Sequence, residues 1–179
     1  MKGYSAMHTI TRLSPSAFPG QVDNLAAILA DVVRSGASVG FRTPFGAVDA
    51  AAWWRTRQPL VADGSLIVWT AADGTGVVGT VSLSLEPKPN GRHRAEVVKL
   101  MVHRLSRGRG LGRALLTTAE QAASSAGATL LLLDTATGSA AERLYATAGW
   151  TRYGIVPDYA TDPSGRLEPC SFFYKQLAT

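Results

Sequence analysis

The chain has 179 residues and a formal net charge of +5, and its length suits one domain with a sizeable core. Hydrophobic residues make up 46% of it and charged residues 17%, which is typical of soluble globular proteins, and no apolar run approaches the roughly 20 residues of a membrane-spanning helix. The one cysteine, Cys170, excludes an intramolecular disulfide and a cysteine-based metal cage, and the first ten residues lack the apolar core of a signal peptide, so we expect a cytoplasmic protein without a metal.

Apolar periodicity and turn residues predict alternating strands and helices, which is typical of an α/β (α+β) fold. We expect one domain over residues 7–179, after a short N-terminal extension, residues 1–6. The expected strands are 7–13, 65–70, 76–85, 94–102, 129–134, 151–156 and 169–174. The expected helices are 22–35, 48–58, 110–126 and 139–148. Ala72-Asp73-Gly74 predicts a hairpin between the second and third strands.

The most informative stretch is Arg107-Gly108-Arg109-Gly110-Leu111-Gly112, followed by Arg113, between an expected strand and an expected helix. The amide N–H groups at a helix start have no partner within the helix, and the helix dipole adds a partial positive charge there. Glycines let the backbone approach a ligand closely and adopt positive φ. This arrangement predicts a cradle for a phosphate-bearing ligand.

The charge distribution allows a second interpretation. Between Arg92 and Arg113 there are six arginines and one lysine, against the single acid Glu96. Such a cluster can be a solvated face or a nucleic-acid footprint. Because four of the arginines lie on the glycine-rich turn and the residues next to it, we favour a phosphorylated cofactor over a polynucleotide.

The spacing of the glycines narrows the choice of ligand. A P-loop is absent, and Gly-x-Gly-x-x-Gly fails after Gly112. What remains is Arg-x-x-Gly-x-Gly, filled by Arg107, Gly110 and Gly112, and it resembles the acetyl-CoA pyrophosphate motif of the GNAT N-acetyltransferases. The segment Ala140–Trp150 is similar to a late helix of this family. Its Ala, Leu, Tyr and Gly positions are filled, whereas Trp150 replaces the usual Phe and Gly138 stands where an Asn is common.

The resemblance implies a GNAT fold: a mixed central sheet of about seven strands, partly splayed at the fourth and fifth, with about four flanking helices. It implies direct transfer of the acetyl group of acetyl-CoA to a primary amine of a small molecule, and a homodimer through the last strands is expected by analogy. The residues that it assigns to acetyl-CoA are Leu100, Met101 and Val102 for pantetheine, Arg107, Gly108, Arg109, Gly110, Leu111, Gly112 and Arg113 for the pyrophosphate, and Ala141 on the late helix.

A narrower similarity concerns the branch of the family that contains tabtoxin-resistance acetyltransferase. It rests on four blocks, Gly36–Phe41, His93–His103, Leu133–Ser139 and Pro157–Ala160. The substrate of that enzyme is a small β-lactam amino acid that bears an amine. The resemblance therefore implies an amino-acid-like toxin or antibiotic as one type of acceptor.

Tyr145 is the candidate general acid. A phenol has an unperturbed pKa of about 10, so it is protonated at neutral pH and can donate its proton to a departing thiolate. The structural alternative is that Tyr145 simply packs on the sheet, and the Leu-Tyr-x-x-x-Gly context of the family favours the functional role.

Two acids, Glu96 and Asp134, are candidates for the base that removes a proton from the amine. The two-residue period of a strand places Glu96 on a face with Val98, Leu100 and Val102, where an acid is costly without a partner. The alternative for Glu96 is an ion pair with Arg94 or another arginine. Asp134 ends an apolar strand and could bind the ammonium of the acceptor or accept its proton, or it could cap the turn that follows.

Other residues indicate less. His93 and His103 are expected to be solvated or capping, Trp53 and Trp54 to lie in the core unless they line the acceptor pocket, and Cys170 to be an unreactive strand residue. Two other functions stay open. One is a protein N-terminal or lysine acetyltransferase, and the other is a non-catalytic module that binds nucleic acid or nucleotides.

Overall fold

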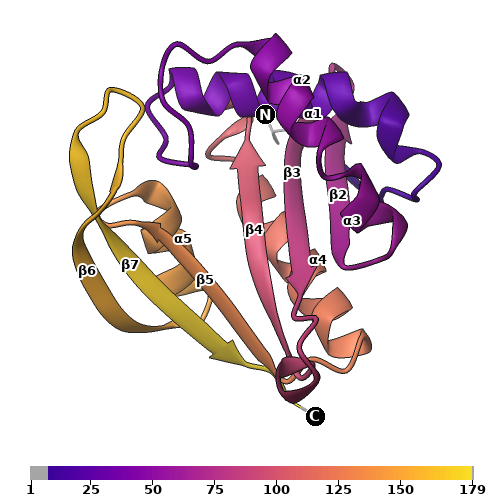
Figure 1. Cartoon of the computed structure of the whole chain (residues 1–179), viewed down its shortest axis with the longest axis vertical. Helices are drawn as coiled ribbons and strands as arrows, with labels where there is room; N and C mark the ends of the chain where they lie inside the picture. Colours follow the sequence, from indigo (N-terminus) through magenta and orange to yellow (C-terminus); the bar gives the residue numbers. More distant parts are fainter. Residues whose placement is uncertain (1–7, 179) are drawn as a thin grey trace, which may run out of the picture.

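The computed structural model describes residues 8–178, which form a seven-stranded sheet in the order β1-β2-β3-β4-β5-β7-β6 (Figure 1). The predicted extension 1–6, residue 7 of the first predicted strand and the terminal residue 179 lie outside the described residues. The strands are β1 (Thr9–Arg12), β2 (Leu66–Asp73), β3 (Gly76–Leu85), β4 (Arg94–Val102), β5 (Leu130–Ala136), β6 (Thr151–Thr161) and β7 (Leu167–Gln176). The α-helices are α1 (Phe18–Arg34), α2 (Ala47–Arg55), α3 (Gln58–Ala62), α4 (Leu111–Ser125) and α5 (Ala140–Thr147).

The predicted fold class is confirmed, with two differences in the helices. Pro19 in the first turn of α1 allows that helix to begin at Phe18, four residues earlier than expected. The helix expected over 48–58 is shorter in the structure, where α2 ends at Arg55. A separate short helix that was not expected, α3, begins at Gln58 with Pro59 in its first turn, where proline is tolerated.

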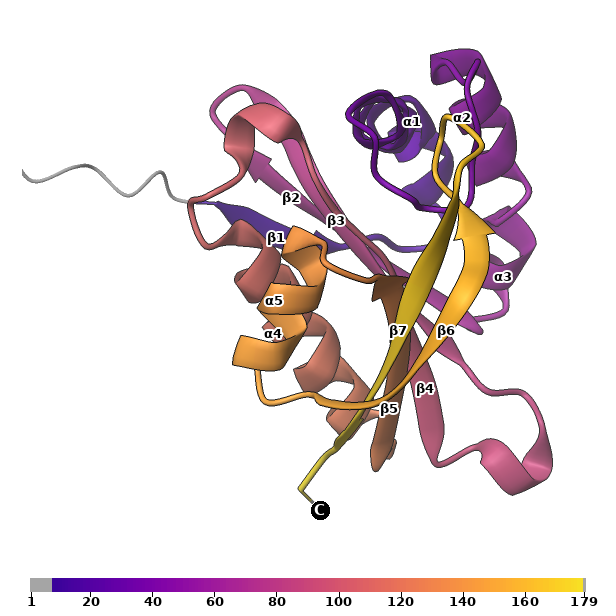
Figure 2. The same ribbon diagram turned by 90° about the vertical axis from the view of Figure 1, so that its left-hand side faces the viewer.

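The helices form two layers around the sheet. Helices α4 and α5 cover one face, and α1, α2 and α3 lie on the other (Figure 2). The core is divided in the same way. One buried cluster contains Leu115 and Leu116 of α4 with Val97 of β4, and the other contains Leu25 of α1 and Trp54 of α2 with Met101 of β4.

Strands β4 and β5 diverge along their length. They are parallel, and they pair only at Arg94–Glu96 of β4, opposite Leu130–Leu132 of β5. Beyond Glu96, β4 continues beside β3 while β5 stays with β7, so the sheet opens between them (Figure 1). The predicted splay between the fourth and fifth strands is therefore confirmed, and it leaves one side of β4 without a strand neighbour from Val97 onward.

A β-bulge interrupts β4 within this splayed part. Val98 lies opposite Ser82 and Met101 opposite Thr80, so β4 has one more residue than β3 over this interval. Lys99 has a φ of 53°, in the left-handed region. The bulge reverses the alternation of the strand: Val97, Leu100 and Val102 all face the α4 cluster.

The expectation that Glu96 shares a face with Leu100 and Val102 is therefore wrong. By alternation Glu96 lies on the face of Val98, which packs with the α1–α2 cluster together with Met101. The extra residue at the bulge moves Leu100 and Val102 to the other face. The strand contains no glycine that would have predicted a bulge.

Candidate active site

The glycine-rich turn has the backbone that an anion cradle requires. Gly108 has a φ of 77°, and Gly110, the N-cap of α4, has a φ of 79°. A Cβ atom at either position would meet nothing within 4 Å, so the space above the turn is open. Leu111, the first residue of α4, is buried in the core and anchors the start of the helix. The N-terminal amides of α4 are thus fixed at the edge of the splayed region.

Gly112 has a different role from the other two glycines. A Cβ atom there would lie 3.3 Å from Cδ2 of Leu144, so the glycine allows α4 and α5 to pack closely. A hydrogen bond of 2.7 Å from Nη2 of Arg113 to Oγ1 of Thr147 joins the same two helices. The turn, α4 and α5, including Ala141, therefore form one packed unit beside β4.

The side chain of Arg107 bonds to the protein itself. Its Nε donates to the carbonyl oxygen of Val102 at 3.0 Å, and its Nη2 donates to Oγ of Ser35 at 3.2 Å. These bonds tie the turn to the end of β4 and to the end of α1. The part of this motif that remains available to a ligand is its backbone, together with the exposed Arg109.

Asp31, which sequence reasoning missed, supports the same turn from α1. Its side chain is 1% exposed, its Oδ2 accepts from the amide of Arg104 at 3.0 Å, and its Oδ1 lies 3.1 Å from Nε of Arg104. His103 lies beside it and accepts from the amide of Leu105, which confirms the predicted capping role. An acid between Ala30 and Val32, in the apolar stripe of a helix, is the signal that could have identified it.

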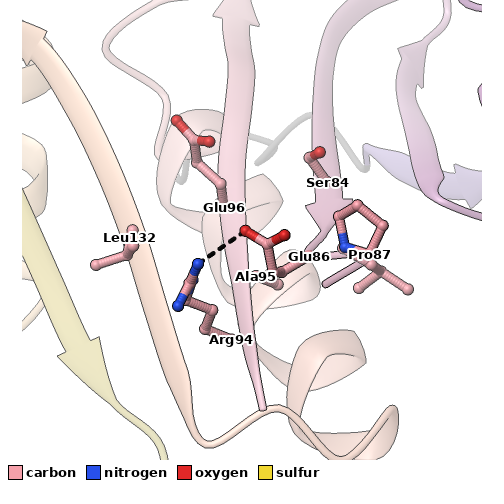
Figure 3. Close-up of a pocket in the computed structure, with 8 residues that line it drawn as sticks. Ser84, Glu86, Pro87, Arg94, Ala95, Glu96 and Leu132 are labelled. Carbon is pink, nitrogen blue, oxygen red and sulfur yellow. Dashed lines mark hydrogen bonds and ion pairs between the residues drawn. The ribbon is translucent and has the colours of Figure 1, made fainter. Parts of the chain in front are cut away.

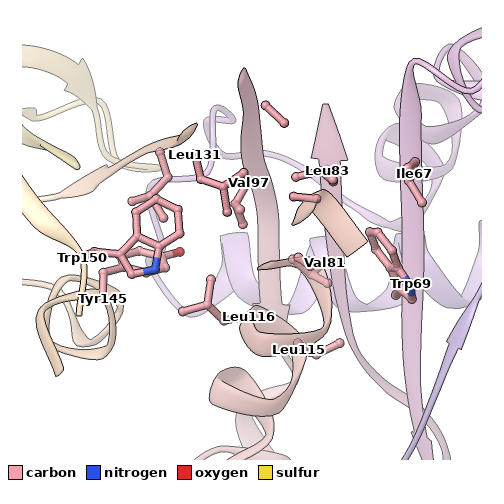
Figure 4. Packing of buried hydrophobic residues seen from close by; sticks show 14 of the residues in the cluster. Ile67, Trp69, Val81, Leu83, Val97, Leu115, Leu116, Leu131, Tyr145 and Trp150 are labelled. Atoms are coloured by element: carbon pink, nitrogen blue, oxygen red, sulfur yellow. The ribbon is translucent and has the colours of Figure 1, made fainter. Parts of the chain in front are cut away.

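Tyr145 extends from α5 into the core beside the splay. It is 5% exposed, and its ring lies beside that of Trp150 (Figure 4), with 6.0 Å between the centroids. The ring centroid of Phe173 also lies 6.0 Å away. Burial raises the pKa of its phenol, and the negative charge of Asp134 raises it further. Tyr145 is therefore protonated at neutral pH, and it lies near enough to Asp134 to respond to its charge.

Glu96 and Asp134 lie on the same face of the sheet. Glu96 is paired in register with Leu132, and Asp134 follows two residues later on β5, opposite in direction to the buried Leu131 and Leu133. Desolvation raises the pKa of Glu96, the charge of Asp134 raises it further, and the charge of Lys99 lowers it. Although part of the Glu96 side chain is exposed, its carboxyl is in an environment that favours the protonated form more than water does.

Neither Glu96 nor Asp134 has the purely structural role that the sequence left open, which was an ion pair with Arg94 for Glu96 and a cap for Asp134. Arg94 pairs with Glu86 at 2.9 Å, and the carboxyl of Glu96 is turned away from it at the rim of a small surface cavity (Figure 3). The turn after β5 is capped by Ser139, whose Oγ accepts from the amide of Glu142 at 3.1 Å. Glu96 is thus not the partner of Arg94, and Asp134 is not the cap of α5.

Cys170 of β7 fixes the carboxylate of Asp134. Its Sγ donates to Oδ2 of Asp134 and to the carbonyl oxygen of Thr135, both at 3.2 Å. Burial, followed by the hydrogen bond to Asp134, raises the pKa of the thiol to about 12. The cysteine is therefore a poor nucleophile, because the thiolate is the reactive form.

Lys99 was not among the predicted site residues, and the structure adds it to this group. Its ammonium lies on the α1–α2 side, near Phe41 and Trp53, and the charges of both Asp134 and Glu96 affect its pKa. Trp54 is 0% exposed in the core, and Trp53 is partly buried against the same cluster, with its ring next to the ammonium of Lys99. A charge inside the apolar run Val97–Val102 was the available signal.

The polar groups thus gather on two sides of the splay. The turn 107–113 and Tyr145 belong to the α4–α5 layer, and Glu96, Asp134 and Lys99 belong to the opposite face. Within residues 8–178, no group of three or more His, Cys, Asp or Glu side chains could hold a metal ion. No helix in this part of the chain is long and apolar enough to cross a membrane.

A splayed pair of parallel strands with a glycine-rich turn after the first is the arrangement that the family resemblance implied. The profile of the Acetyltransferase (GNAT) family matches residues 37–150. The chain belongs to this family. The rat (Rattus norvegicus) protein N-acetyltransferase 8F1 is 36% identical over 101 residues, which cover 55% of this chain and 45% of that protein. This chain thus matches less than half of the length of that relative.

Solved structures of other proteins share the fold of this GNAT protein over nearly its whole length. Ribosomal-protein-alanine N-acetyltransferase from Brucella melitensis is 24% identical, with a TM-score of 0.76 over 94% of this chain and 99% of that one. A phosphinothricin acetyltransferase from Sinorhizobium meliloti, solved in complex with AcCoA, is 18% identical, with a TM-score of 0.77 over 95% of this chain and 88% of that one. At these identities the similarity establishes the fold.

Proposed function

We propose that this GNAT protein transfers the acetyl group of acetyl-CoA directly to a primary amine of a small molecule. The observation that carries the proposal is the position of the left-handed turn at Gly108 and Gly110 beside the part of β4 that has no strand neighbour on the β5 side. A pyrophosphate fits the amides of the turn, and an extended pantetheine arm fits the backbone edge. The AcCoA complex of the Sinorhizobium meliloti enzyme supports this choice of donor.

The residues divide between the parts of the donor. Backbone groups of Leu100, Met101 and Val102 hold pantetheine, and the turn from Arg107 to Arg113 holds the pyrophosphate, with Ala141 of α5 beside it. One β4 amide donates to the carbonyl oxygen of the thioester. Loss of such a donor typically costs about 2.7–4 kcal/mol of barrier.

The transfer makes a C–N bond and breaks the C–S bond of the thioester. The amine must lose a proton, and Glu96 is the base, because desolvation and the charge of Asp134 raise the pKa of its carboxyl. Asp134 binds the ammonium and increases the basicity of Glu96. Tyr145 donates its proton to the sulfur of the departing thiolate. Cys170 takes no part as a nucleophile, so the route is direct.

Hydrogen bonds across the acceptor side favour a small molecule over a protein. The loop before α2 and the β6–β7 hairpin approach each other (Figures 1 and 2), and Oγ of Ser38 donates to the carbonyl oxygen of Thr161 at 3.2 Å. The amide and Oγ1 of Thr43 both donate to the carbonyl oxygen of Pro163 at 2.9 Å. The joined loop and hairpin cover the acceptor side of the sheet and leave little room for a protein substrate to dock there. The similarity to the tabtoxin-resistance branch supports an amino-acid-like toxin or antibiotic, and resistance as the role.

The internal bonds of the arginines weigh against a nucleic-acid module. Arg94, Arg104, Arg107 and Arg113 each bond to a group of the protein, so the basic cluster serves mainly as internal ties. We further propose one domain over residues 7–179, a cytoplasmic location and a homodimer through the last strands. The exposure of Tyr153, Ile155 and Val156 on the outer strand β6 fits that dimer.

An acceptor screen tests the proposal. Released thiol is measured with acetyl-CoA and amino acids, polyamines, aminoglycosides or peptides, and the melting temperature is measured with acetyl-CoA and with DNA. Stabilisation by low-micromolar acetyl-CoA and turnover of small amines are expected. Turnover of peptides alone would make the chain a protein acetyltransferase. Salt-sensitive DNA binding without stabilisation by acetyl-CoA would make it a binding module.

A further inference from the structure

Lys99 has an unusual backbone and an unusual environment for a lysine. It lies at the bulge of β4 with a φ of 53°, a conformation that is uncommon for residues other than glycine. Its side chain is half-buried rather than solvated. The bulge thus directs the side chain of Lys99 to the α1–α2 side of the sheet, the same side as its neighbour Val98. In a strand without a bulge, two successive side chains would point to opposite sides.

The ammonium of Lys99 contacts the loop that precedes α2. Its Nζ donates to the carbonyl oxygen of Val39 at 3.0 Å, and it lies 5.7 Å from the ring centroid of Phe41 and 5.2 Å from that of Trp53. The two rings stabilise a cation through their faces. The charge is therefore fixed in position instead of moving on a flexible surface stem.

Within the described part of the chain, the ammonium of Lys99 has no carboxylate partner. Across residues 8–178, no acid lies within ion-pair distance of Lys99, whereas Lys175, the other partly buried lysine in that range, pairs with Glu120 at 2.7 Å. An ammonium has three donors, and the bond to Val39 uses one of them. Desolvation lowers the pKa of Lys99, while the charges of Asp134 and Glu96 act in the opposite direction. A half-buried ammonium that has no carboxylate beside it among residues 8–178, and that keeps free donors, indicates a ligand of opposite charge.

We propose that Lys99 binds a carboxylate of the acceptor, so that the enzyme acts on an amino acid or a close analogue with a free carboxylate near its amine. The site then has two poles. Nζ of Lys99 receives the carboxylate, and Glu96 and Asp134 receive the ammonium. This inference rests on the proposed acetyl transfer and names the acceptor of the same site. A polyamine would bring a second cation towards Lys99 and is excluded by repulsion.

A role limited to fastening the loop to β4 predicts different behaviour. Such a role requires only a hydrogen-bond donor to the carbonyl oxygen of Val39, and its loss would weaken the turnover of all acceptors alike. A carboxylate-binding role affects only the acceptors that carry the charge. The comparison of each acceptor with its uncharged amide therefore separates the two roles.

The experiment measures kcat/KM for the proteinogenic amino acids, each paired with its α-carboxamide, in wild type, Lys99→Met, Lys99→Arg and the exposed control Lys88→Met. We expect at least one amino acid to exceed its amide about 10- to 100-fold in the wild type. In Lys99→Met the amino acid loses most of this advantage through a raised KM. Lys99→Arg keeps part of the advantage, and Lys88→Met keeps all of it.

Equal or better turnover of the amides, or an advantage that persists in Lys99→Met, would overturn the proposal. If no pair is turned over, the test of the proposal is binding instead. The melting temperature is then measured with each acid and each amide, with and without CoA. Stabilisation by acids alone that disappears in Lys99→Met supports the carboxylate site, and no selective stabilisation overturns it. Failure of the proposed acetyl transfer gives a different result, because acetyl-CoA would then not raise the melting temperature.

Discussion

The two faces of the sheet at β4 present different kinds of chemistry. On the α4–α5 face the proposed donor site consists mostly of backbone: the turn at Gly108 and Gly110 and the edge of β4. On the α1–α2 face the proposed acceptor site consists of charged side chains, Glu96, Lys99 and Asp134, from two strands. A donor that is the same for a whole family suits a site of main-chain groups. An acceptor that differs among members suits a site of side chains that can be exchanged.

Tyr145 is where the two faces meet, because it belongs to the α5 layer and yet responds to the charge of Asp134. Substitutions on each face, and at Tyr145, therefore have different expected effects.

Tyr145→Phe tests the meeting point. The phenyl ring keeps the packing against Trp150 and Phe173, so the fold is retained while the proton donor is lost. We expect kcat to fall about 100- to 10,000-fold with little change in the KM of acetyl-CoA. Steady-state kinetics with both substrates varied measure this. Unchanged turnover would remove Tyr145 from the mechanism.

Glu96→Gln and Asp134→Asn separate the two acids. We expect Glu96→Gln to lower kcat/KM about 100- to 10,000-fold, since it removes the base. Asp134→Asn removes a negative charge that raises the pKa of Glu96, so that pKa falls. The acidic limb of the pH–rate profile then moves to lower pH, and the activity at neutral pH falls less than in Glu96→Gln. The reverse pattern would make Asp134 the base.

Gly110→Val tests the donor face, and Gly127→Val is its matched control. Gly110 precedes α4 with a φ of 79°, Gly127 follows the same helix with a φ of 84°, and neither would meet a neighbour within 4 Å. Valine is strained at both positions, by about 1–3 kcal/mol. We expect Gly110→Val to weaken acetyl-CoA binding at least about tenfold, whereas Gly127→Val costs only stability. Calorimetry measures both, and full affinity in Gly110→Val would refute the cradle.

The smallest effect concerns stability on the acceptor face. The pKa of Glu96 is raised on folding, so the folded state binds its proton more tightly than the unfolded state does. Stability is therefore lost as the pH rises through the folded pKa, and the ionised Glu96 is destabilising at neutral pH. We expect Glu96→Gln to raise the free energy of unfolding at about pH 7, and to change it much less at about pH 4. Chemical denaturation at both values measures the difference, and an equal effect at both would contradict it.

Most of the fold was readable because its signals are local. The turn residues and apolar periods predicted all seven strands, and the glycine pattern predicted the start of α4. The early end of α2 at Arg55 and the separate helix α3 were missed, although Pro59 is a common residue in the first turn of a helix. The bulge at Lys99 was not readable, because it depends on how β3 and β4 pair and not on any residue that forces it.

The family, the position of the glycine-rich turn and the candidates Tyr145, Glu96 and Asp134 were readable in the amino-acid sequence, because each stands in a local motif or breaks an apolar run. How these residues are combined depends on the three-dimensional packing. The bulge sets which side chains face the acceptor side, and Cys170, 36 residues further along the chain on the neighbouring strand β7, donates a hydrogen bond to Asp134. The loop at Val39–Phe41 came over Lys99 from another part of the chain. Such contacts depend on strand register and on packing between segments far apart in the chain, which no local pattern encodes.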